Sequence, residues 1–398
     1  MSRISLISKT GMELAIITAV DSILFEARSR QKQIVALIRE MVECESPSDN
    51  PTAVNRFVDL LSDVAPSFAR VKTVPGGRFG RHAVCEFDLF GAKKEGRILA
   101  LGHSDTVWPL GTLATMPFRQ KDGRLWGPGV LDMKAGIAFF IYAMRILRDL
   151  EVPVAHKVVM QINSDEEVGS ESSRALTEKN AKRSKAVLVL EPGTGLEGKL
   201  KTARKGIGGY TVTVRGKAAH SGLDFGGGAS AILELARQIE KIAGFTDLPR
   251  GVTVNPGVIS GGTRVNVVAA EASTEVDMRV PRLKDAAALD RKFHALRPVD
   301  KRCAIEITGG LNRPPLERSS AIVQLFSKAQ ALAREMDVEL DESSVGGGSD
   351  GNFTAALGVP TLDGLGAVGE GAHALNESIL VDRIADRTAL LAKLVAAL

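Results

Sequence analysis

The sequence has few cysteines and no block of like charge, and these absences exclude several classes of protein. Its three cysteines, Cys44, Cys85 and Cys303, lie far apart and form no CxxC pair. We therefore expect neither a disulfide framework nor a metal site built from cysteine alone. Lysine and arginine number 51 against 47 acids, and both signs are mixed along the chain, so no nucleic-acid partner is expected.

Long apolar runs are also missing. The N-terminal segment ELAIITAVDSILF is interrupted by Glu13 and Asp21, and it has no small-residue cleavage site of a signal peptide. We predict a helix over residues 13–44, no membrane association and a cytoplasmic location. Met12 is an alternative start, which would make the first residues a tail.

The length and the apolar periodicity predict two domains. At 398 residues with 44% hydrophobic residues, the chain is too long for one ordinary core. From about residue 98, the strand-like segments RILALG, KVVMQIN and AVLVL alternate with helical segments. This order is typical of an α/β fold with a mostly parallel sheet flanked by helices.

The middle of the chain has a different pattern. Its elements follow the order β-α-β-β-α-β, which predicts a ferredoxin-like domain over residues 204–317. The segments after residue 317 resemble those of the first domain. We therefore expect the small domain to be inserted into a larger one, made of residues 1–203 and 318–398.

Possible metal ligands follow three predicted strands at the point where each strand ends. His103 and Asp105 follow RILALG, Glu166 and Glu167 follow KVVMQIN, and Glu191 follows AVLVL. The carboxyl ends of parallel strands meet at one edge of the sheet, where such folds bind their ligands. Exposed acids at one strand end are common, but acids and a histidine at three strand ends favour a shared site.

Several of these residues have both a structural and a functional explanation. Asp105 can accept the second ring N–H of His103, although that histidine alone could simply be satisfied at a strand end. Asp132 precedes a predicted helix, so it can cap the helix or bridge two cations. Glu166 and Glu167 repel each other unless a cation lies near them. One could then bind metal while the other acts as a base, or both could be solvated loop residues.

Two glycine-rich loops lie near the C-terminus. GEGAHALNESI contains His373, a further candidate ligand, and GGGSDG at 346–351 contains Gly348, whose backbone N–H could bind an anionic substrate group. The second loop lacks the Lys-Ser/Thr of a phosphate loop. GIGGY is weak support for a dehydrogenase, because no strand–GxGxxG–helix unit with a following acid is present.

The candidate ligands are imidazoles and carboxylates without a thiolate. This set suits zinc, and also cobalt or manganese. Two such ions bridged by a carboxylate and a water are a common hydrolytic design. The residues therefore predict a hydrolase with two divalent metal ions.

The motifs resemble a known family, the zinc amidohydrolases that include aminoacylase, acetylornithine deacetylase, succinyl-diaminopimelate desuccinylase and bacterial glutamate carboxypeptidase. The matching segments occur in the family's order: LGHSDTV, GPGVLDMKAG, SDEEVGS, VLEPG, RKGIGGYTVTVRGKAAHSG, GGTRVNVV and GGGSD. The resemblance runs from about residue 30 to the end. It is greatest to the glutamate carboxypeptidase branch, because VLEPG has glutamate where many deacylases have aspartate.

The resemblance implies a metal-binding role for five residues. Asp132 would bridge the two ions, His103 and Glu191 would complete one site, and Glu167 and His373 would complete the other. The family's general base matches Glu166, and the residue that orients His103 matches Asp105.

The resemblance also implies residues that act on the substrate. His220, in GKAAHSG, would reach the active site of a partner subunit and stabilise the oxyanion, so a homodimer formed by the small domain is expected. Asn266 and Arg313 match positions that hold the substrate. Arg279 aligns as well, although an exposed strand arginine explains it equally.

We therefore expect hydrolysis of a C-terminal amide bond in a small peptide, with release of an amino acid such as glutamate. A deacylase acting on an N-acyl amino acid is the alternative within the class. A catalytically silent protein that binds a metal or an amide is the alternative of another class, and the intact set of ligands and base argues against it.

Overall fold

The computed structural model describes residues 22–92 and 96–398, so residues 13–21 of the expected first helix lie outside the described part. The chain divides into two compact units. Unit 1 runs up to Thr202 and includes Arg318–Ser344 and Ser349–Leu398, whereas unit 2 comprises Ala203–Glu317 and Val345–Gly348. The segment 345–348, which we expected in the larger domain, belongs to unit 2.

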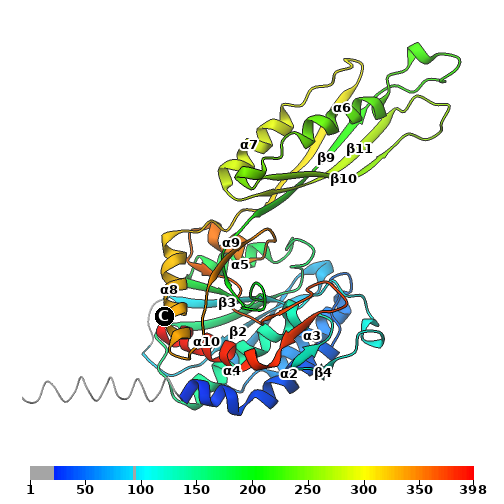
Figure 1. Ribbon diagram of the computed structural model, residues 1–398. Helices are drawn as coiled ribbons and strands as arrows, with labels where there is room; N and C mark the ends of the chain where they lie inside the picture. The colour runs from blue at the N-terminus through cyan, green and yellow to red at the C-terminus, as the bar shows by residue number, and fades with distance from the viewer. Residues whose placement is uncertain (1–21, 93–95) are drawn as a thin grey trace, which may run out of the picture. The chain divides into compact units, whose positions relative to one another are not determined.

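Unit 1 is built around a six-stranded sheet with the order β1-β2-β6-β3-β7-β14 (Figure 1). The pairs β6–β3, β3–β7 and β7–β14 are parallel, and β2 runs antiparallel to both of its neighbours. The predicted α/β class with a mostly parallel sheet is confirmed. The strands are β1 (Ala69–Pro75), β2 (Arg81–Phe87), β3 (Arg97–His103), β6 (Lys157–Asn163), β7 (Ser184–Val189) and β14 (Thr361–Leu362).

Both faces of this sheet are covered. Along β3, Ile98 and Ala100 belong to one hydrophobic cluster while Leu99 and Leu101 belong to another, because successive side chains of a strand point to opposite faces. Strands buried on both faces read as continuous apolar runs, as RILALG does. The helices of unit 1 include α2 (Gln31–Glu43), α3 (Pro51–Val64), α4 (Ala135–Asp149), α5 (Arg174–Ala181), α8 (Ser320–Arg334), α9 (Gly351–Ala356) and α10 (Ile384–Ala397).

A second, smaller sheet in unit 1 has the order β15-β16-β5-β4. It is antiparallel throughout and joins a hairpin near residue 120 to one near residue 375. The sheet therefore holds the loops around Asp132 and His373 together. Its strands are β4 (Arg119–Lys121), β5 (Arg124–Trp126), β15 (Gly369–Glu370) and β16 (Ser378–Leu380).

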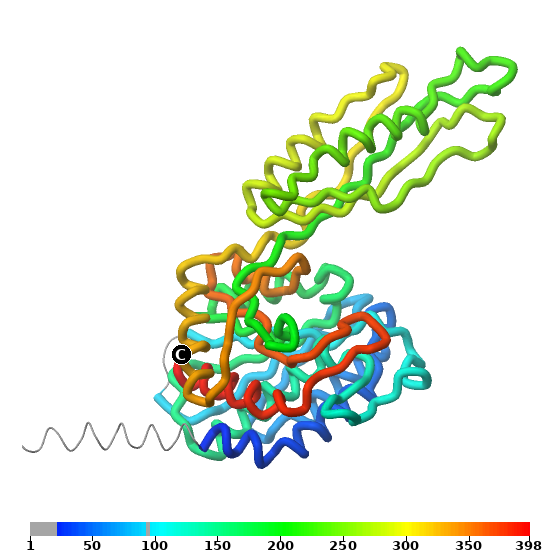
Figure 2. The backbone as a smooth tube through the Cα atoms, viewed as in Figure 1, coloured from blue at the N-terminus to red at the C-terminus, as the bar shows by residue number. Residues whose placement is uncertain are grey.

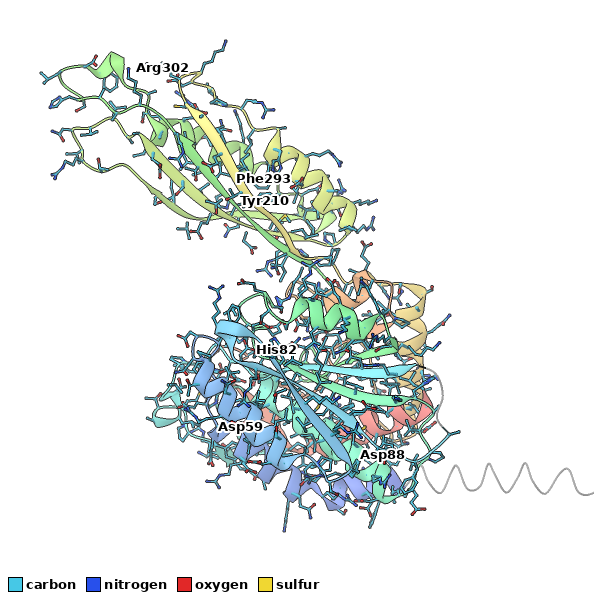
Figure 3. All side chains as sticks on the ribbon, turned by 180° about the vertical axis from the view of Figure 1, so that it is seen from behind. Asp59, His82, Asp88, Tyr210, Phe293 and Arg302 are labelled. Atoms are coloured by element: carbon cyan, nitrogen blue, oxygen red, sulfur yellow. The ribbon has the colours of Figure 1, made fainter. Side chains whose placement is uncertain are left out.

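Unit 2 has the predicted β-α-β-β-α-β order. Its antiparallel sheet has the order β10-β11-β9-β12, and Tyr210 and Phe293 stack in its core with ring centroids 3.9 Å apart (Figure 3). The ferredoxin-like arrangement is confirmed. The elements are β9 (Gly206–Arg215), α6 (Ala231–Ala243), β10 (Thr253–Gly261), β11 (Glu271–Val280), α7 (Leu283–His294) and β12 (Ala304–Arg313).

The chain passes between the units four times. It leaves unit 1 within β8 (Leu200–Arg204), returns at Arg318, enters unit 2 again at the end of β13 (Glu342–Val345), and is back in unit 1 from Ser349 (Figure 2). The strands β8 and β13 pair with each other. Across residues 22–92 and 96–398, no helix has both the length and the apolar character needed to span a membrane.

Candidate metal centre

The five expected ligands come from five segments of unit 1. β3 ends at His103, β6 precedes the loop with Glu167, and β7 precedes Glu191. Asp132 lies in the irregular segment η3 (Val130–Lys134), where its dihedral angles (φ −117°, ψ 92°) are not helical. His373 lies in the turn between β15 and β16 with a φ of 62°.

Asp132 does not cap the helix that follows it. α4 begins at Ala135, its N-cap position is Lys134, and no side chain caps the helix. The structural explanation that competed with a metal-bridging role is therefore removed. The carboxylate lies instead beside two histidines.

These five side chains form two groups that share Asp132. Asp132 Oδ1 lies 3.1 Å from His103 Nε2, and Asp132 Oδ2 lies 3.4 Å from His373 Nε2. Glu191 Oε1 lies 3.4 Å from His103 Nε2, and Glu167 Oε1 lies 3.3 Å from His373 Nε2. Within each group of three, the candidate ligand atoms lie within 4.8 Å of one another.

The donor atoms fit a pair of divalent ions. Each group offers one imidazole nitrogen and two carboxylate oxygens, and Asp132 gives one oxygen to each group. Zinc and similar ions accept this mixture of ligands. Glu167 Oε1 is buried and has no hydrogen-bond donor, because its 3.3 Å contact with His373 lacks the geometry of a hydrogen bond. A cation would satisfy that oxygen.

The carboxylates perturb the titration of both histidines. Burial lowers the pKa of His103, but the contacts with Asp132 and Glu191 outweigh burial and raise the pKa well above its usual value. Contacts with Asp132 and Glu167 raise the pKa of His373 to about 10. Burial would raise the pKa of Asp132, but its contacts with the two histidines lower it. The site therefore attracts positive charge.

His103 is oriented by the main chain of Asp105. His103 Nδ1 lies 2.9 Å from the Asp105 carbonyl oxygen, so Nδ1–H donates there and Nε2 is left to bind a metal. The Asp105 carboxylate also lies beside this ring, with Oδ1 3.6 Å from His103 Nδ1, and it has further hydrogen-bond partners. It accepts the backbone N–H groups of Glu166 and Glu167, each at 3.1 Å, and the hydroxyl of Ser48 at 2.8 Å. Burial raises the pKa of Asp105 to about 6.

Glu166 lies outside both groups of candidate ligands. It is half-buried, and its charge helps to raise the pKa of His103. The adjacent glutamates are therefore separated in space, with Glu167 among the candidate ligands and Glu166 beside them. Ser48, which supports Asp105, was missed because nothing in its local sequence indicates a distant carboxylate partner.

In unit 2, His220 and Asn266 are brought together. Ser221 N donates to the Asn266 carbonyl oxygen at 3.0 Å, and His220 pairs with Val267. His220 Nδ1 accepts the backbone N–H groups of Gly222 and Leu223 at 3.1 and 3.2 Å. These bonds place the ring proton on Nε2, and the side chain is exposed.

The other expected substrate-binding residues lie at the opposite end of β9. Arg279 and Arg313 both pair with Ile207, and a side chain at Gly348 would collide with Ile207 and Arg313. Arg279 Nε donates to both carboxylate oxygens of Asp277, at 2.9 and 3.1 Å, so Arg279 already has an anionic partner. Arg313 is buried, and Gly348 packs close to it.

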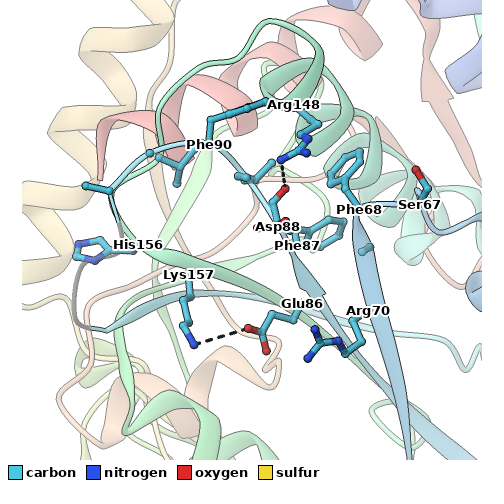
Figure 4. A pocket seen from close by; sticks show the side chains of 15 residues that line it. Ser67, Phe68, Arg70, Glu86, Phe87, Asp88, Phe90, Arg148, His156 and Lys157 are labelled. Carbon is cyan, nitrogen blue, oxygen red and sulfur yellow. Dashed lines mark hydrogen bonds and ion pairs between the residues drawn. The ribbon is translucent and has the colours of Figure 1, made fainter.

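A cavity of about 840 Å³ in unit 1 is formed by other residues (Figure 4). It is lined among others by Phe68, Arg70, Glu86, Phe90 and Lys157, and by none of the candidate ligands. This cavity is therefore separate from the candidate metal centre. His82 is also outside both ligand groups: it is buried and accepts the Ser164 backbone N–H at 3.2 Å.

Comparison with known proteins identifies the family of this chain. The sequence model of the peptidase family M20/M25/M40 matches residues 99–397. The chain belongs to this family. It is therefore a metallopeptidase or amidohydrolase, and the resemblance stated from the motifs is confirmed.

Individual relatives have several activities. Carboxypeptidase G2 of Pseudomonas sp. strain RS-16 is 28% identical over 363 residues, which are 89% of this chain and 86% of the relative. Acetylornithine deacetylase of Erwinia tasmaniensis is 27% identical over 343 residues, 78% of this chain and 85% of the relative. The structure of aminopeptidase PepT from Bacillus cereus has a TM-score of 0.78 at 23% identity, covering 92% of this chain and 98% of that one.

Binding of divalent metal to the metal-free protein should release protons. Both His103 and His373 hold a proton at neutral pH because their pKa values are raised, and a metal can bind only the neutral imidazole. The apparent affinity should therefore rise with pH until the pH passes about 10, the pKa of His373. Titration calorimetry in two buffers of different ionisation enthalpy measures the protons released.

The variant His373→Ala is the control for this titration, and it should release about one proton fewer. A binding enthalpy that does not depend on the buffer would contradict the assignment of the two histidines.

Proposed function

We propose that this protein is a dinuclear metal hydrolase that cleaves a C-terminal amide bond and releases an amino acid such as glutamate. The observation that carries the proposal is the position of Asp132, whose two oxygens each face one group of ligands. The five residues would hold two ions, most simply zinc, with cobalt or manganese as substitutes. The expected cytoplasmic location stays a prediction.

The residues at the two ligand groups, together with Glu166 and Asp105, would each have a role in hydrolysis. Divalent ions bound there would lower the pKa of a water molecule and polarise the scissile carbonyl. Glu166 takes the proton of the attacking water and passes it to the leaving amine nitrogen. Asp105 holds the Glu166 backbone at 3.1 Å, so the base sits on a fixed segment.

The carboxypeptidase proposal rests on two observations. Carboxypeptidase G2 matches 89% of the chain, and Glu191 is a glutamate where many deacylases of the family have an aspartate. The similar identity to acetylornithine deacetylase favours a second candidate, an N-acyl amino acid deacylase. Both reactions cleave the amide on an amino-acid nitrogen and release that amino acid. They differ in the acyl group on the other side of the bond.

A homodimer is part of the proposal. His220 and Asn266 lie beyond one end of β9, whereas Arg313 and Gly348 lie at the other end. Ten residues of strand separate them, a distance of about 30 Å. One small substrate cannot contact both groups of the same chain. We infer that the His220 Nε2–H is donated to the oxyanion in the active site of a partner copy.

The substrate class can be tested with a panel of amides. The metal-loaded protein should hydrolyse acyl-glutamates and dipeptides with a C-terminal glutamate faster than N-acetyl derivatives of other amino acids. Release of free amino acid, measured as kcat/KM for each compound, gives the ranking. A preference for N-acetyl amino acids would support the deacylase, and no turnover with bound metal would support the catalytically silent protein.

The variant Glu166→Gln should lower kcat by about 10²- to 10⁴-fold, because a general base contributes a factor of this size. Its metal content, measured by elemental analysis, should equal that of the wild type, since Glu166 lies outside both ligand groups. Glu171→Gln is the matched control, because Glu171 lies in the same loop and is 68% exposed. Loss of metal from Glu166→Gln would show that Glu166 is a ligand and not the base.

Mixing two inactive variants tests the shared site. Glu166→Gln lacks the base and His220→Ala lacks the oxyanion donor, so each homodimer should be nearly inactive. After subunit exchange about half of the dimers are mixed and each has one intact site, so about a quarter of the wild-type activity should return. If the mixture stays inactive although mass spectrometry shows mixed dimers, His220 acts in the active site of its own chain.

A further inference from the structure

A buried carboxylate that is not among the candidate ligands lies next to the metal centre. Glu377 is 0% exposed, and both of its oxygens are fully used by N–H donors. Its Oε1 accepts the backbone N–H groups of Leu131 and Asp132 at 2.8 and 3.1 Å. Its Oε2 accepts Trp108 Nε1–H at 2.8 Å and Gly129 N–H at 3.0 Å.

These four bonds join three segments that carry candidate ligands. Trp108 belongs to the loop that follows His103, and Gly129–Asp132 is the segment that presents Asp132. Glu377 is itself in the turn of His373: its N–H donates to the Ala374 carbonyl at 2.9 Å, and β16 begins at the next residue. The Glu377 side chain therefore connects the His373 turn to the two loops that bring Asp132 and His103.

We infer that Glu377 is a positioning residue of the metal centre, which fixes Asp132 relative to His103 and His373 so that its two oxygens reach both ligand groups. The inference rests on the proposed dinuclear site. Glu377 would contact neither metal nor substrate, because it acts through the backbone of η3 and through Trp108. Groups that orient metal ligands in this way affect metal affinity by about 10- to 100-fold.

The chemistry of the donors explains why this residue is a carboxylate. All four donors are neutral N–H groups, two on each oxygen, so only a side chain with two acceptor oxygens satisfies them. Burial raises the pKa of Glu377, and the four hydrogen bonds oppose that shift. A glutamine has one oxygen and one NH₂ group, so in either orientation its NH₂ group faces two donors.

The variant Glu377→Gln tests the inference. Its affinity for Zn²⁺, measured by competition with a chelator, should fall about 10- to 100-fold. The visible absorption of the Co²⁺-loaded protein should also change, because the ligand geometry at Asp132 changes. A loss of fold stability alone would not alter the spectrum of the folded, Co²⁺-saturated protein.

Glu234→Gln is the matched control. Glu234 is another fully buried carboxylate, and it accepts the backbone N–H groups of Val299 and Asp300, each at 2.9 Å, in unit 2. Glu234→Gln should lose stability in the same way as Glu377→Gln, but its Zn²⁺ affinity and Co²⁺ spectrum should equal those of the wild type.

A second substitution should partly rescue the first. In Glu377→Gln, an amide NH₂ group at the position of Oε2 would face the N–H groups of Trp108 and Gly129, and Trp108→Phe removes the first of these. The double variant should therefore bind Zn²⁺ more tightly than the sum of the two single losses predicts. If Glu377→Gln does not fold, Trp108→Phe alone, which removes one bond of four, should still weaken Zn²⁺ binding several-fold.

Three results would overturn the inference: unchanged Zn²⁺ affinity and an unchanged Co²⁺ spectrum in folded Glu377→Gln, an equal effect of Glu234→Gln, or full Zn²⁺ affinity in Trp108→Phe. Absence of Zn²⁺ binding by the wild type would instead refute the proposed metal centre itself, so the two failures are distinguishable.

Discussion

The site depends on one carboxylate that two histidines share. Asp132 Oδ1 faces His103 and Oδ2 faces His373, at 3.1 and 3.4 Å. The segment η3 leaves helical geometry at Asp132 before α4 begins, so Asp132 is not held in a helical turn. The rest of the site follows from this irregular segment.

The sheet supplies the remaining geometry. β3, β6 and β7 are parallel neighbours, so the residues that follow them meet at one edge, as in other open α/β folds. Asp105 contributes to this arrangement with both its main-chain carbonyl and its side-chain carboxylate. Its carbonyl orients His103, and its carboxylate holds the backbone of Glu166 and Glu167. One residue thus aligns a candidate ligand of one group with the base and with a ligand of the other group.

The long, strongly patterned elements were predictable from sequence, whereas contacts between distant segments were not. RILALG and KVVMQIN read as buried strands because both of their faces are covered, and the β-α-β-β-α-β order of unit 2 is visible in its alternation. The strands of β4, β5, β15 and β16 are two or three residues long, too short for a periodicity. Ser48 and Glu377 were missed for a related reason, since their partners are far away in the chain. His373 was a candidate ligand from its glycine-rich loop, but its place beside Glu167 and Asp132 came from the family resemblance.

The measurement that tests the dinuclear centre most directly is the anomalous scattering of a zinc-soaked crystal. Two peaks about 3.5–4 Å apart should appear, the usual separation in two-metal hydrolytic sites. One should contact His103 and Glu191, the other Glu167 and His373, and Asp132 should contact both. A single peak, or peaks away from Asp132, would contradict the assignment.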